Sequence, residues 1–338
     1  MLSVRDVIAL RFVPRLPNDE LRRLATECTS LDDALVRLGH HQLDLVELAE
    51  RQLQRCRELD VSILPWTDER YPPRLRDAIS PPAVIFVRGI LPAPSLPSIG
   101  VVGTRSCTMH YGKPVTESLV ETWVARRAVI ISGLAHGIDT IAHQTTVQRH
   151  GSTIAVIASG IDRITPIVAQ QLADRIVAAG GCILSEHPCG VAALPPAFPA
   201  RNRIIAGLSD AVVVVESKHR GGALITAEFA RQKQRPVYAV PGPITSVRSQ
   251  GCHALIASHS ARVLTCADDV VEVPKLAAEL TLSHEAVLGF ESGTPQHLDD
   301  LAMAWSCSAS DALRRVLDLE LEGRITRLPG NRFLARIA

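Results

Sequence analysis

The stretch Ser98-Ile99-Gly100-Val101-Val102-Gly103-Thr104-Arg105 is an apolar run that ends in a glycine turn and a basic residue. A helical pattern follows it, and the same succession of apolar run, turn and helix recurs from residues 128–133, 153–160, 182–186, 211–216 and 236–240. Short apolar runs that alternate with helices are typical of a parallel sheet covered on both faces. The sequence therefore predicts an α/β domain with a doubly wound, mainly parallel sheet.

The segments on either side have different patterns. Residues 1–64 show Leu, Val and Ile at helical spacing and predict a small all-helical domain. Residues 65–98 are rich in proline around one apolar run and predict a connector with a short strand. We place the α/β domain at 99–272, a linker at 273–295 and a winged-helix domain at 296–338, where two helical patterns precede a hairpin with a Pro-Gly-Asn turn.

Composition excludes several classes of protein. The 338 residues contain no apolar run of about 18 residues, so we expect no membrane insertion. Charges at Arg5 and Asp6 interrupt the first apolar stretch, which is unlike a signal peptide, and we expect a cytoplasmic protein. The eight cysteines are scattered without a C-x-x-C pair, which argues against a disulfide framework or a zinc ribbon and favours reduced packing residues.

The net charge of +1 hides an uneven distribution of charged residues. Residues 201–262 hold nine Lys or Arg and three acidic residues, whereas residues 1–64 are mildly acidic. A concentrated basic stretch is typical of a site for anions. A solvated face without a ligand remains open as the alternative explanation of this charge.

The turn at Gly103-Thr104-Arg105 leads toward a helix that opens at Tyr111-Gly112. Backbone N–H groups at a helix start, together with the Arg105 guanidinium, suit a phosphate. The segment lacks the G-x-G-x-x-G pattern of a dinucleotide site, and its Gly112-Lys113 pair lacks the spacing of a Walker motif. We expect no cofactor, and an anion site and a purely structural turn both remain open.

The turn after the second predicted strand spans residues 132–139 and contains two glycines, which allow close approach of a ligand to the backbone. It also contains His136, and His143 follows on the next helix. Because no third ligand occurs at metal-binding spacing, we expect no metal site.

Two further turns carry basic residues at helix starts. Arg201-Asn202-Arg203 follow a proline-rich loop and suit phosphates, while a structural contact with a carboxylate such as Glu186 is the alternative. Lys218 and Arg220 precede the pair Gly221-Gly222, where free N–H groups at a helix start favour an anion.

These motifs together resemble the DNA-processing protein A (DprA/Smf) family over about residues 66–272. The segments that carry the resemblance are Gly103-Thr104-Arg105, 132–139, Leu184-Ser185-Glu186, 198–208, 221–226 and Pro241-Gly242. The tail resembles the family's winged-helix end, and the helical start resembles its small SAM/HhH-like N-terminal domain.

The resemblance implies an extended Rossmann-like domain that takes single-stranded DNA into a basic pocket. It also implies a homodimer that loads the RecA recombinase in natural transformation, without catalysis. The DNA-binding residues expected on this basis are Gly103, Arg105, Ser132, Gly133, His136, Gly137, Arg201, Asn202, Arg203, Lys218, Gly221, Gly222, Leu224 and Thr226.

Two other functions remain open. A nucleotide phosphoribohydrolase of the lysine-decarboxylase-like (LOG) type also has a glycine-rich helix start followed by a glutamate, which Gly221-Gly222 and Glu228 echo at a different spacing. A protein scaffold would bind partners without nucleic acid. The tail has six acidic residues and six arginines from Gln296 onward, so protein contact is at least as well supported there as duplex reading.

Overall fold

The computed structural model describes residues 1–39, 44–270, 295–305, 307–321 and 325–335. The chain divides into two compact units, Met1–Lys275 and Leu276–Ala338. Of the linker expected at 273–295, only Pro295 lies among the described residues. Within the described ranges, no helix has both the length and the apolar character that a bilayer crossing requires.

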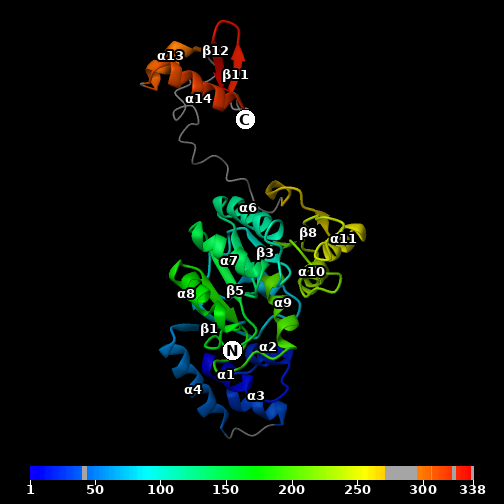
Figure 1. Ribbon diagram of the computed structural model, residues 1–338. Helices are drawn as coiled ribbons and strands as arrows, with labels where there is room; N and C mark the ends of the chain where they lie inside the picture. The colour runs from blue at the N-terminus through cyan, green and yellow to red at the C-terminus, as the bar shows by residue number, and fades with distance from the viewer. Residues whose placement is uncertain (40–43, 271–294, 306, 322–324, 336–338) are drawn as a thin grey trace. The chain divides into compact units, whose positions relative to one another are not determined.

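The first unit is a central sheet with helices on both faces (Figure 1). Its helices are α1 (Val4–Arg11), α2 (Asn18–Glu27), α3 (Leu31–Leu38), α4 (Leu45–Glu58), α5 (Pro73–Arg76), α6 (Gly112–Ala125), α7 (Ile138–Gln148), α8 (Gln170–Ala178), α9 (Ala197–Leu208), α10 (Ala223–Gln232) and α11 (Gln250–Ala257), with 3₁₀ turns at Ile167–Ala169 and Ala267–Asp269. Its strands are β1 (Val61–Pro65), β2 (Val84–Gly89), β3 (Ser98–Val102), β4 (Val129–Ser132), β5 (Thr153–Val156), β6 (Cys182–Ser185), β7 (Ala211–Val214), β8 (Val237–Ala239) and β9 (Arg262–Val263).

The strands pair in the order β1-β2-β6-β5-β4-β3-β7-β8-β9. All neighbours from β6 to β9 are parallel, whereas β2 is antiparallel to both β1 and β6. The six apolar runs of the sequence form β3 to β8, so the doubly wound, mainly parallel sheet is confirmed.

Successive side chains of the parallel strands point to opposite faces of the sheet. Ile130 and Val213 pack in one cluster with side chains of α6 and α7. Their neighbours Val129 and Val212 pack in another cluster with side chains of α9 and α10. Because helices cover both faces, these strands are apolar at most positions and do not alternate with polar residues.

Strand β1 begins inside the segment, residues 1–64, that the sequence predicts to be all helical. It pairs with β2 in an antiparallel register, Val61 opposite Arg88 and Pro65 opposite Val84. The β-branched residues of β1 favour a strand. However, five residues directly after a helical pattern are too few for their periodicity to distinguish a strand from a continuation of the helix.

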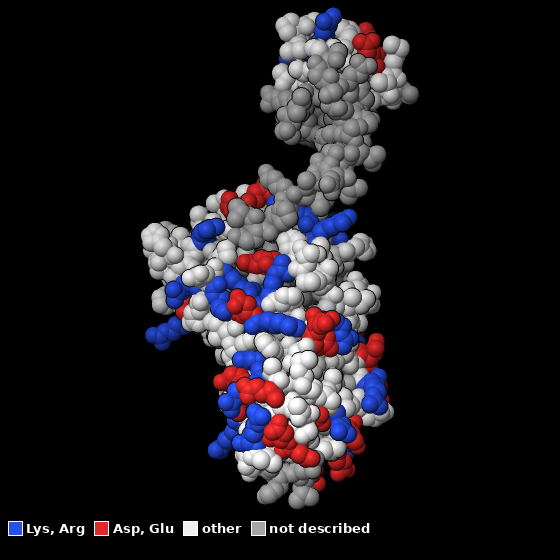
Figure 2. All heavy atoms as spheres, turned by 180° about the vertical axis from the view of Figure 1, so that it is seen from behind, with Lys and Arg blue, Asp and Glu red and all other residues white. Residues whose placement is uncertain are grey.

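The four helices before β1 form a compact layer whose apolar side chains pack against the sheet. Ile8, Leu21 and Leu35 belong to the same buried cluster as Phe86 of β2. On the outer surface of this layer, acidic and basic side chains lie interspersed (Figure 2), as in the ion pair of Arg37 with Asp33. Opposite charges at close spacing leave little net field for an anion here.

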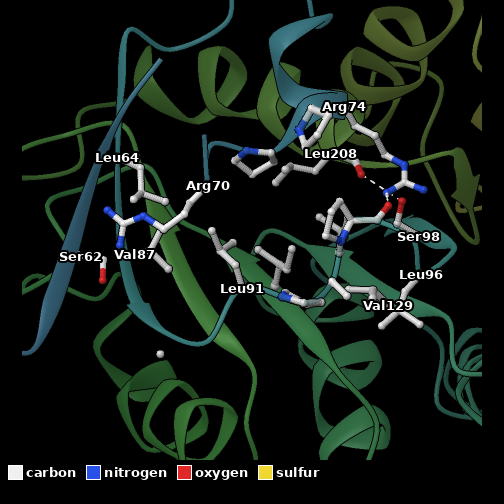
Figure 3. Close-up of a pocket in the computed structure, with 18 of the residues that line it drawn as sticks. Ser62, Leu64, Arg70, Arg74, Val87, Leu91, Leu96, Ser98, Val129 and Leu208 are labelled. Atoms are coloured by element: carbon white, nitrogen blue, oxygen red, sulfur yellow. Dashed lines mark hydrogen bonds between the residues drawn. The ribbon is translucent and has the colours of Figure 1, made fainter. Parts of the chain in front are cut away.

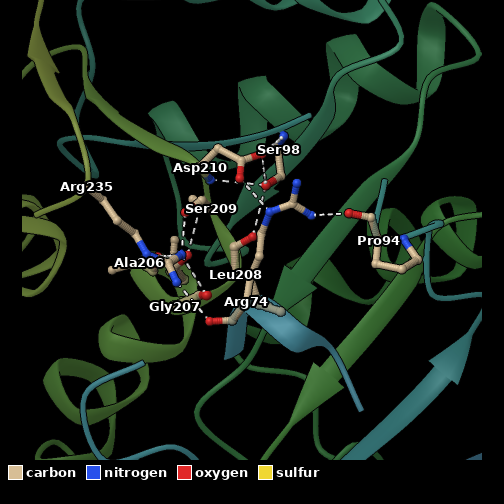
Figure 4. Close-up of polar contacts among 10 residues, drawn as sticks. Arg74, Pro94, Ser98, Ala206, Gly207, Leu208, Ser209, Asp210 and Arg235 are labelled. Carbon is tan, nitrogen blue, oxygen red and sulfur yellow. Dashed lines mark hydrogen bonds and ion pairs between the residues drawn. The ribbon is translucent and has the colours of Figure 1, made fainter. Parts of the chain in front are cut away.

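The connector is fastened to the amino end of the sheet by polar contacts (Figure 4). Arg74, on α5, forms an ion pair with Asp210, just before β7. Asp210 also accepts hydrogen bonds from the backbone nitrogen and the hydroxyl of Ser98, at 2.8 and 3.0 Å. Three segments that are distant in sequence are therefore joined where β3 and β7 begin.

Arg235 completes this network from the loop before β8 (Figure 4). It donates to the carbonyl oxygens of Ala206 and Gly207 at 2.8 and 2.7 Å, and to that of Ser209. Its second terminal nitrogen donates to the carbonyl oxygen of Arg74 at 2.8 Å. One guanidinium thus donates hydrogen bonds to the carbonyl oxygens at the end of α9, which have no partner within the helix.

The second unit is small and has its own core. It contains β10 (Gln296–His297), α13 (Leu298–Ala304), α14 (Ala309–Leu321), β11 (Ile325–Leu328) and β12 (Arg332–Ala335), with the strands in the antiparallel order β10-β12-β11. Leu301, Val316, Ile325 and Phe333 are buried together. Two helices followed by a hairpin confirm the predicted winged helix.

Replacing Arg235 by Ala should lower the free energy of unfolding by about 2 kcal/mol, because hydrogen bonds from a charged donor each contribute about 1.5–3 kcal/mol and partial exposure reduces this. Urea unfolding followed by circular dichroism measures the change. The matched control is Arg231→Ala, since Arg231 is exposed and pairs with Glu228 at the surface. Equal losses in both variants would contradict the anchoring role of Arg235.

Candidate nucleic-acid interface

The winding of the sheet reverses between β3 and β7. After β3 the chain crosses to β4 on one side, and after β7 it crosses to β8 on the other. In doubly wound sheets, ligands bind at the carboxyl ends of the strands at such a reversal. A pocket of about 550 Å³ opens there, lined by residues within 102–105, 195–205 and 217–226 and by Ala135 and Asp139. We call it the switch-point pocket.

Arg201, on the first turns of α9, forms the floor of this pocket. Its side chain is buried, and Nη1 donates to the carbonyl oxygen of Gly133 at 2.7 Å and to that of Val156. Those carbonyls belong to the ends of β4 and β5, so one guanidinium joins two strand ends. A Cβ at position 133 would lie 2.6 Å from an Arg201 nitrogen, so a side chain here would displace the guanidinium.

Asp139, on the first turn of α7, supplies the opposite charge. Its carboxylate is buried and accepts a hydrogen bond from the backbone nitrogen of Gly133 at 3.1 Å. Burial raises the pKa of Asp139 to about 6, although the charge of Arg201 acts in the other direction. Burial also lowers the pKa of Arg201 to about 10, so the guanidinium stays charged at neutral pH.

Three exposed cations, Arg105, Lys218 and Arg220, lie along the rim of the pocket. In the part of the chain that the structure describes, none of them forms an ion pair. The Arg105 guanidinium lies over the ring of Phe198, 5.5 Å from its centroid. Unpaired cations at the mouth of a recess concentrate positive potential there, which attracts anions.

The start of α10 contributes backbone donors to the same rim. Gly221 fits tightly against Ser217, since a Cβ at position 221 would lie 2.1 Å from the Ser217 hydroxyl oxygen. Gly222 faces open space, because a Cβ at position 222 would have no atom within 4 Å. Asn202 fixes this turn by donating to the carbonyl oxygen of Gly222 at 3.3 Å. A helix start that faces open space beside cations is suited to a phosphate.

The start of α6 differs from the expectation of an anion site. The Thr108 hydroxyl accepts from the backbone nitrogen of Gly112 at 2.7 Å and donates to Glu216 Oε1 at 2.6 Å. Glu216 is buried and also accepts from the backbone nitrogen of Thr108 at 2.9 Å. The chain's own carboxylate therefore occupies this helix start, which favours the structural turn of the two alternatives that the sequence left open.

The structure brings eight of the expected DNA-binding residues together in the switch-point pocket. These are Gly103, Arg105, Arg201, Asn202, Lys218, Gly221, Gly222 and Thr226. They come from the turn after β3, the first half of α9, the turn that leads into α10 and, for Thr226, α10 itself. Their role in binding DNA stays a prediction.

The other expected residues lie outside the pocket lining. Ser132 donates to the carbonyl oxygen of Val101 at 2.6 Å, and Gly137 fits against the backbone of Thr104 and Arg105. His136 is exposed, whereas His143 is buried and faces the Thr153 hydroxyl at 2.8 Å. No cluster of three or more metal-ligating side chains occurs within the described residues.

Arg203 and Leu224 also point elsewhere. Arg203 forms a buried ion pair with Glu186 at 2.6 Å, which is the structural contact that the sequence left open as an alternative. Leu224 lines a shallow hollow on the outer side of α10 together with Glu228. The pocket lining includes Phe198 and Arg220, which were not among the expected contacts, although Arg220 adjoins Gly221 in the sequence.

A second pocket, of about 500 Å³, lies at the opposite, amino end of the strands (Figure 3). Its lining is mainly apolar and includes Leu64, Val87, Leu91 and Val129. Arg74 at its border is already engaged with Asp210. None of the expected DNA-binding residues lines it, so the basic motifs gather at one end of the sheet only.

Comparison with known families agrees with this arrangement. The model of the family described as DNA recombination-mediator protein A matches residues 62–275, and the DprA winged helix domain matches residues 272–331. The chain belongs to the DprA/Smf family. The fold of both units is therefore that of a known family of DNA-processing proteins.

Relatives and solved structures of this family resemble the chain over most of its length. DNA processing protein DprA of Streptococcus pneumoniae is 42% identical over 204 residues, 60% of this chain and 71% of that protein. Protein Smf of Escherichia coli is 34% identical over 287 residues, 79% of this chain and 76% of that protein. The X-ray structure of the Streptococcus pneumoniae protein has a TM-score of 0.63 at 34% identity, with 80% of this chain and 92% of that chain covered.

DNA processing protein A of Helicobacter pylori, solved to explain its single-stranded DNA binding mode, is also similar. Its TM-score is 0.56 at 25% identity, with 62% of this chain and 94% of that chain covered.

The charge of Asp139 should make the stability of the protein depend on pH. Because its folded pKa, about 6, lies above the value of about 3.9 in an unfolded chain, its contribution to stability falls as pH rises from about 4 to about 6. Asp139→Asn cannot titrate. The difference in unfolding free energy, native protein minus variant, should fall by about 2 kcal/mol between pH 4 and pH 7. Urea unfolding across this range measures it, and parallel profiles would show that Asp139 does not titrate as described.

Proposed function

We propose that the chain binds single-stranded DNA through its phosphates, at the switch-point pocket, and acts without catalysis. The observation that carries the proposal is the set of three exposed cations, Arg105, Lys218 and Arg220, around a recess whose floor is already neutralised. Family membership and the likeness to the Helicobacter pylori protein support the choice of single-stranded DNA as the ligand.

The binding mode follows from the chemistry of the rim. Arg105, after β3, and Lys218, after β7, supply charges at the pocket, and the open helix start at Gly222 adds backbone donors. These groups are suited to successive phosphates and carry no information about the bases. Phe198, held beneath Arg105, offers one aromatic face for a base. Affinity should therefore depend on salt and only weakly on sequence.

We propose the further roles of the family for this chain as well. The protein acts as a cytoplasmic homodimer. Bound to single-stranded DNA, it delivers this DNA to the RecA recombinase in natural transformation. In this proposal the divisions at residues 64, 98, 272 and 295 separate a helical domain, a connector, the DNA-binding domain, a linker and the winged helix.

Salt-dependent titration tests the DNA-binding proposal. Fluorescence anisotropy with a labelled oligo-dT strand should show that Arg105→Ala combined with Lys218→Ala weakens binding by at least about tenfold. The slope of log affinity against log salt should become shallower by about 1.4, because each lost phosphate contact on a single strand accounts for about 0.7.

The matched control combines Arg51→Ala with Arg149→Ala. Both side chains are exposed, pair with nearby glutamates and lie outside the pocket, and the change in net charge is the same. Equal weakening in the two double variants would mean that net charge, and not this pocket, governs binding. A matched duplex that bound as tightly as the strand would also count against the proposal.

The geometry also separates this proposal from nucleotide hydrolysis. Glu228 is exposed on the outer side of α10, where it pairs with Arg231 at 2.9 Å and accepts from Gln232 at 2.8 Å. It does not line the switch-point pocket. Glu228→Ala should leave oligo-dT affinity within about twofold of the native value, since no binding group is removed. Release of a free base from nucleoside monophosphates by the native protein, lost in Glu228→Ala, would favour the hydrolase instead.

A further inference from the structure

Two cysteines that are distant in sequence meet in the first unit. The sulfur atoms of Cys56 and Cys189 lie 3.9 Å apart. Cys56 is buried on α4, and Cys189 is partly exposed in the loop between β6 and α9. A disulfide requires about 2.05 Å between the sulfurs, so they must approach by about 2 Å.

The loop that carries Cys189 is held by hydrogen bonds and has open space at the next residue. Gly190 has a φ of +89° and would have no atom within 4 Å of an added Cβ. The backbone nitrogen of Gly190 donates to Asp162 at 2.8 Å, and the carbonyl oxygen of Val191 accepts from Gly160 at 2.8 Å. Asp162 also forms an ion pair with Arg55 of α4 at 3.9 Å, so the loop is held next to α4, and the open space lies at Gly190.

The two thiols are also chemically unequal. The hydrogen bond between the two thiols lowers the pKa of Cys189. The same hydrogen bond, together with burial, raises the pKa of Cys56. A thiolate is the form of cysteine that attacks an oxidant, and Cys189 is the more accessible of the two.

We propose that Cys56 and Cys189 form a redox-sensitive pair that hydrogen peroxide converts to a disulfide. The Cys189 thiolate attacks the peroxide, the O–O bond breaks, and Cys189 becomes a sulfenic acid while hydroxide leaves and takes up a proton. The Cys56 sulfur then displaces the sulfenic hydroxyl as water and the S–S bond forms. Two thiols lose two electrons, and the peroxide is reduced to two waters. A thiol reductant reverses the change.

The bond would fasten α4 to the loop that leads into the switch-point pocket. Pro195, at the end of this loop, and Phe198, on the first turn of α9, both line that pocket. Oxidation therefore restrains the segment that carries Phe198. The bond itself forms whether or not the pocket binds DNA.

Mass spectrometry after mild peroxide treatment tests the pair in the full-length protein. Digestion with a Glu-specific protease, under non-reducing conditions, separates residues 51–58 from residues 187–216, and each peptide contains one cysteine. We expect these peptides as a linked species, lost on reduction. The oxidised protein should also melt about 5 °C above the reduced protein, because the bond closes a long loop of the unfolded chain.

Three serine variants complete the test. Cys56→Ser and Cys189→Ser should each abolish the linked species and the difference in melting temperature. Cys266→Ser removes an exposed cysteine elsewhere and should leave both unchanged. Free thiols at Cys56 and Cys189 after peroxide treatment, or oxidation confined to Cys266, would overturn the proposal. A loss of DNA binding without loss of the linked species would affect the proposed function only.

Discussion

The candidate site depends on the buried guanidinium of Arg201. It reaches from α9 to the carbonyl oxygens at the ends of β4 and β5, and Asp139 on α7 lies close enough to offset its charge. A buried charge that loses its partner is strongly destabilising, so the loops of this sheet edge are held in one arrangement. Because the floor is neutralised internally, the unpaired cations of the rim determine the field that a ligand meets.

The charged side chains at the two ends of the sheet differ in whether they are already paired. At the amino end, Arg74, Asp210 and Arg235 use their charges on one another and on backbone carbonyls (Figure 4). At the carboxyl end, Arg105 and Lys218 have no acidic partner among the described residues. Similar residue types therefore serve stability at one end and remain available for a ligand at the other.

Much of the fold could be predicted from sequence because buried parallel strands are apolar runs between turns, as in β3 to β8. The sequence did not predict strand β1, because this strand is short and follows a helical pattern. The motifs also predicted that basic residues would gather at one edge of the sheet, but not which of these charges are already paired within the chain. Glu216 accepts a hydrogen bond from Thr108, 108 positions away, and closes the start of α6, whereas the ion pair of Arg203 with Glu186 was one of two alternatives that the sequence left open. Such contacts between distant segments leave no local pattern, and the same holds for Cys56 and Cys189.

The most direct test of the account is a crystal structure of the protein with a short oligo-dT strand. We expect phosphate oxygens within hydrogen-bonding distance of Arg105, Lys218 and the Gly222 backbone nitrogen, with Arg201 still bound to the Gly133 and Val156 carbonyls. A strand bound at another surface, with the switch-point pocket empty, would contradict the central claim.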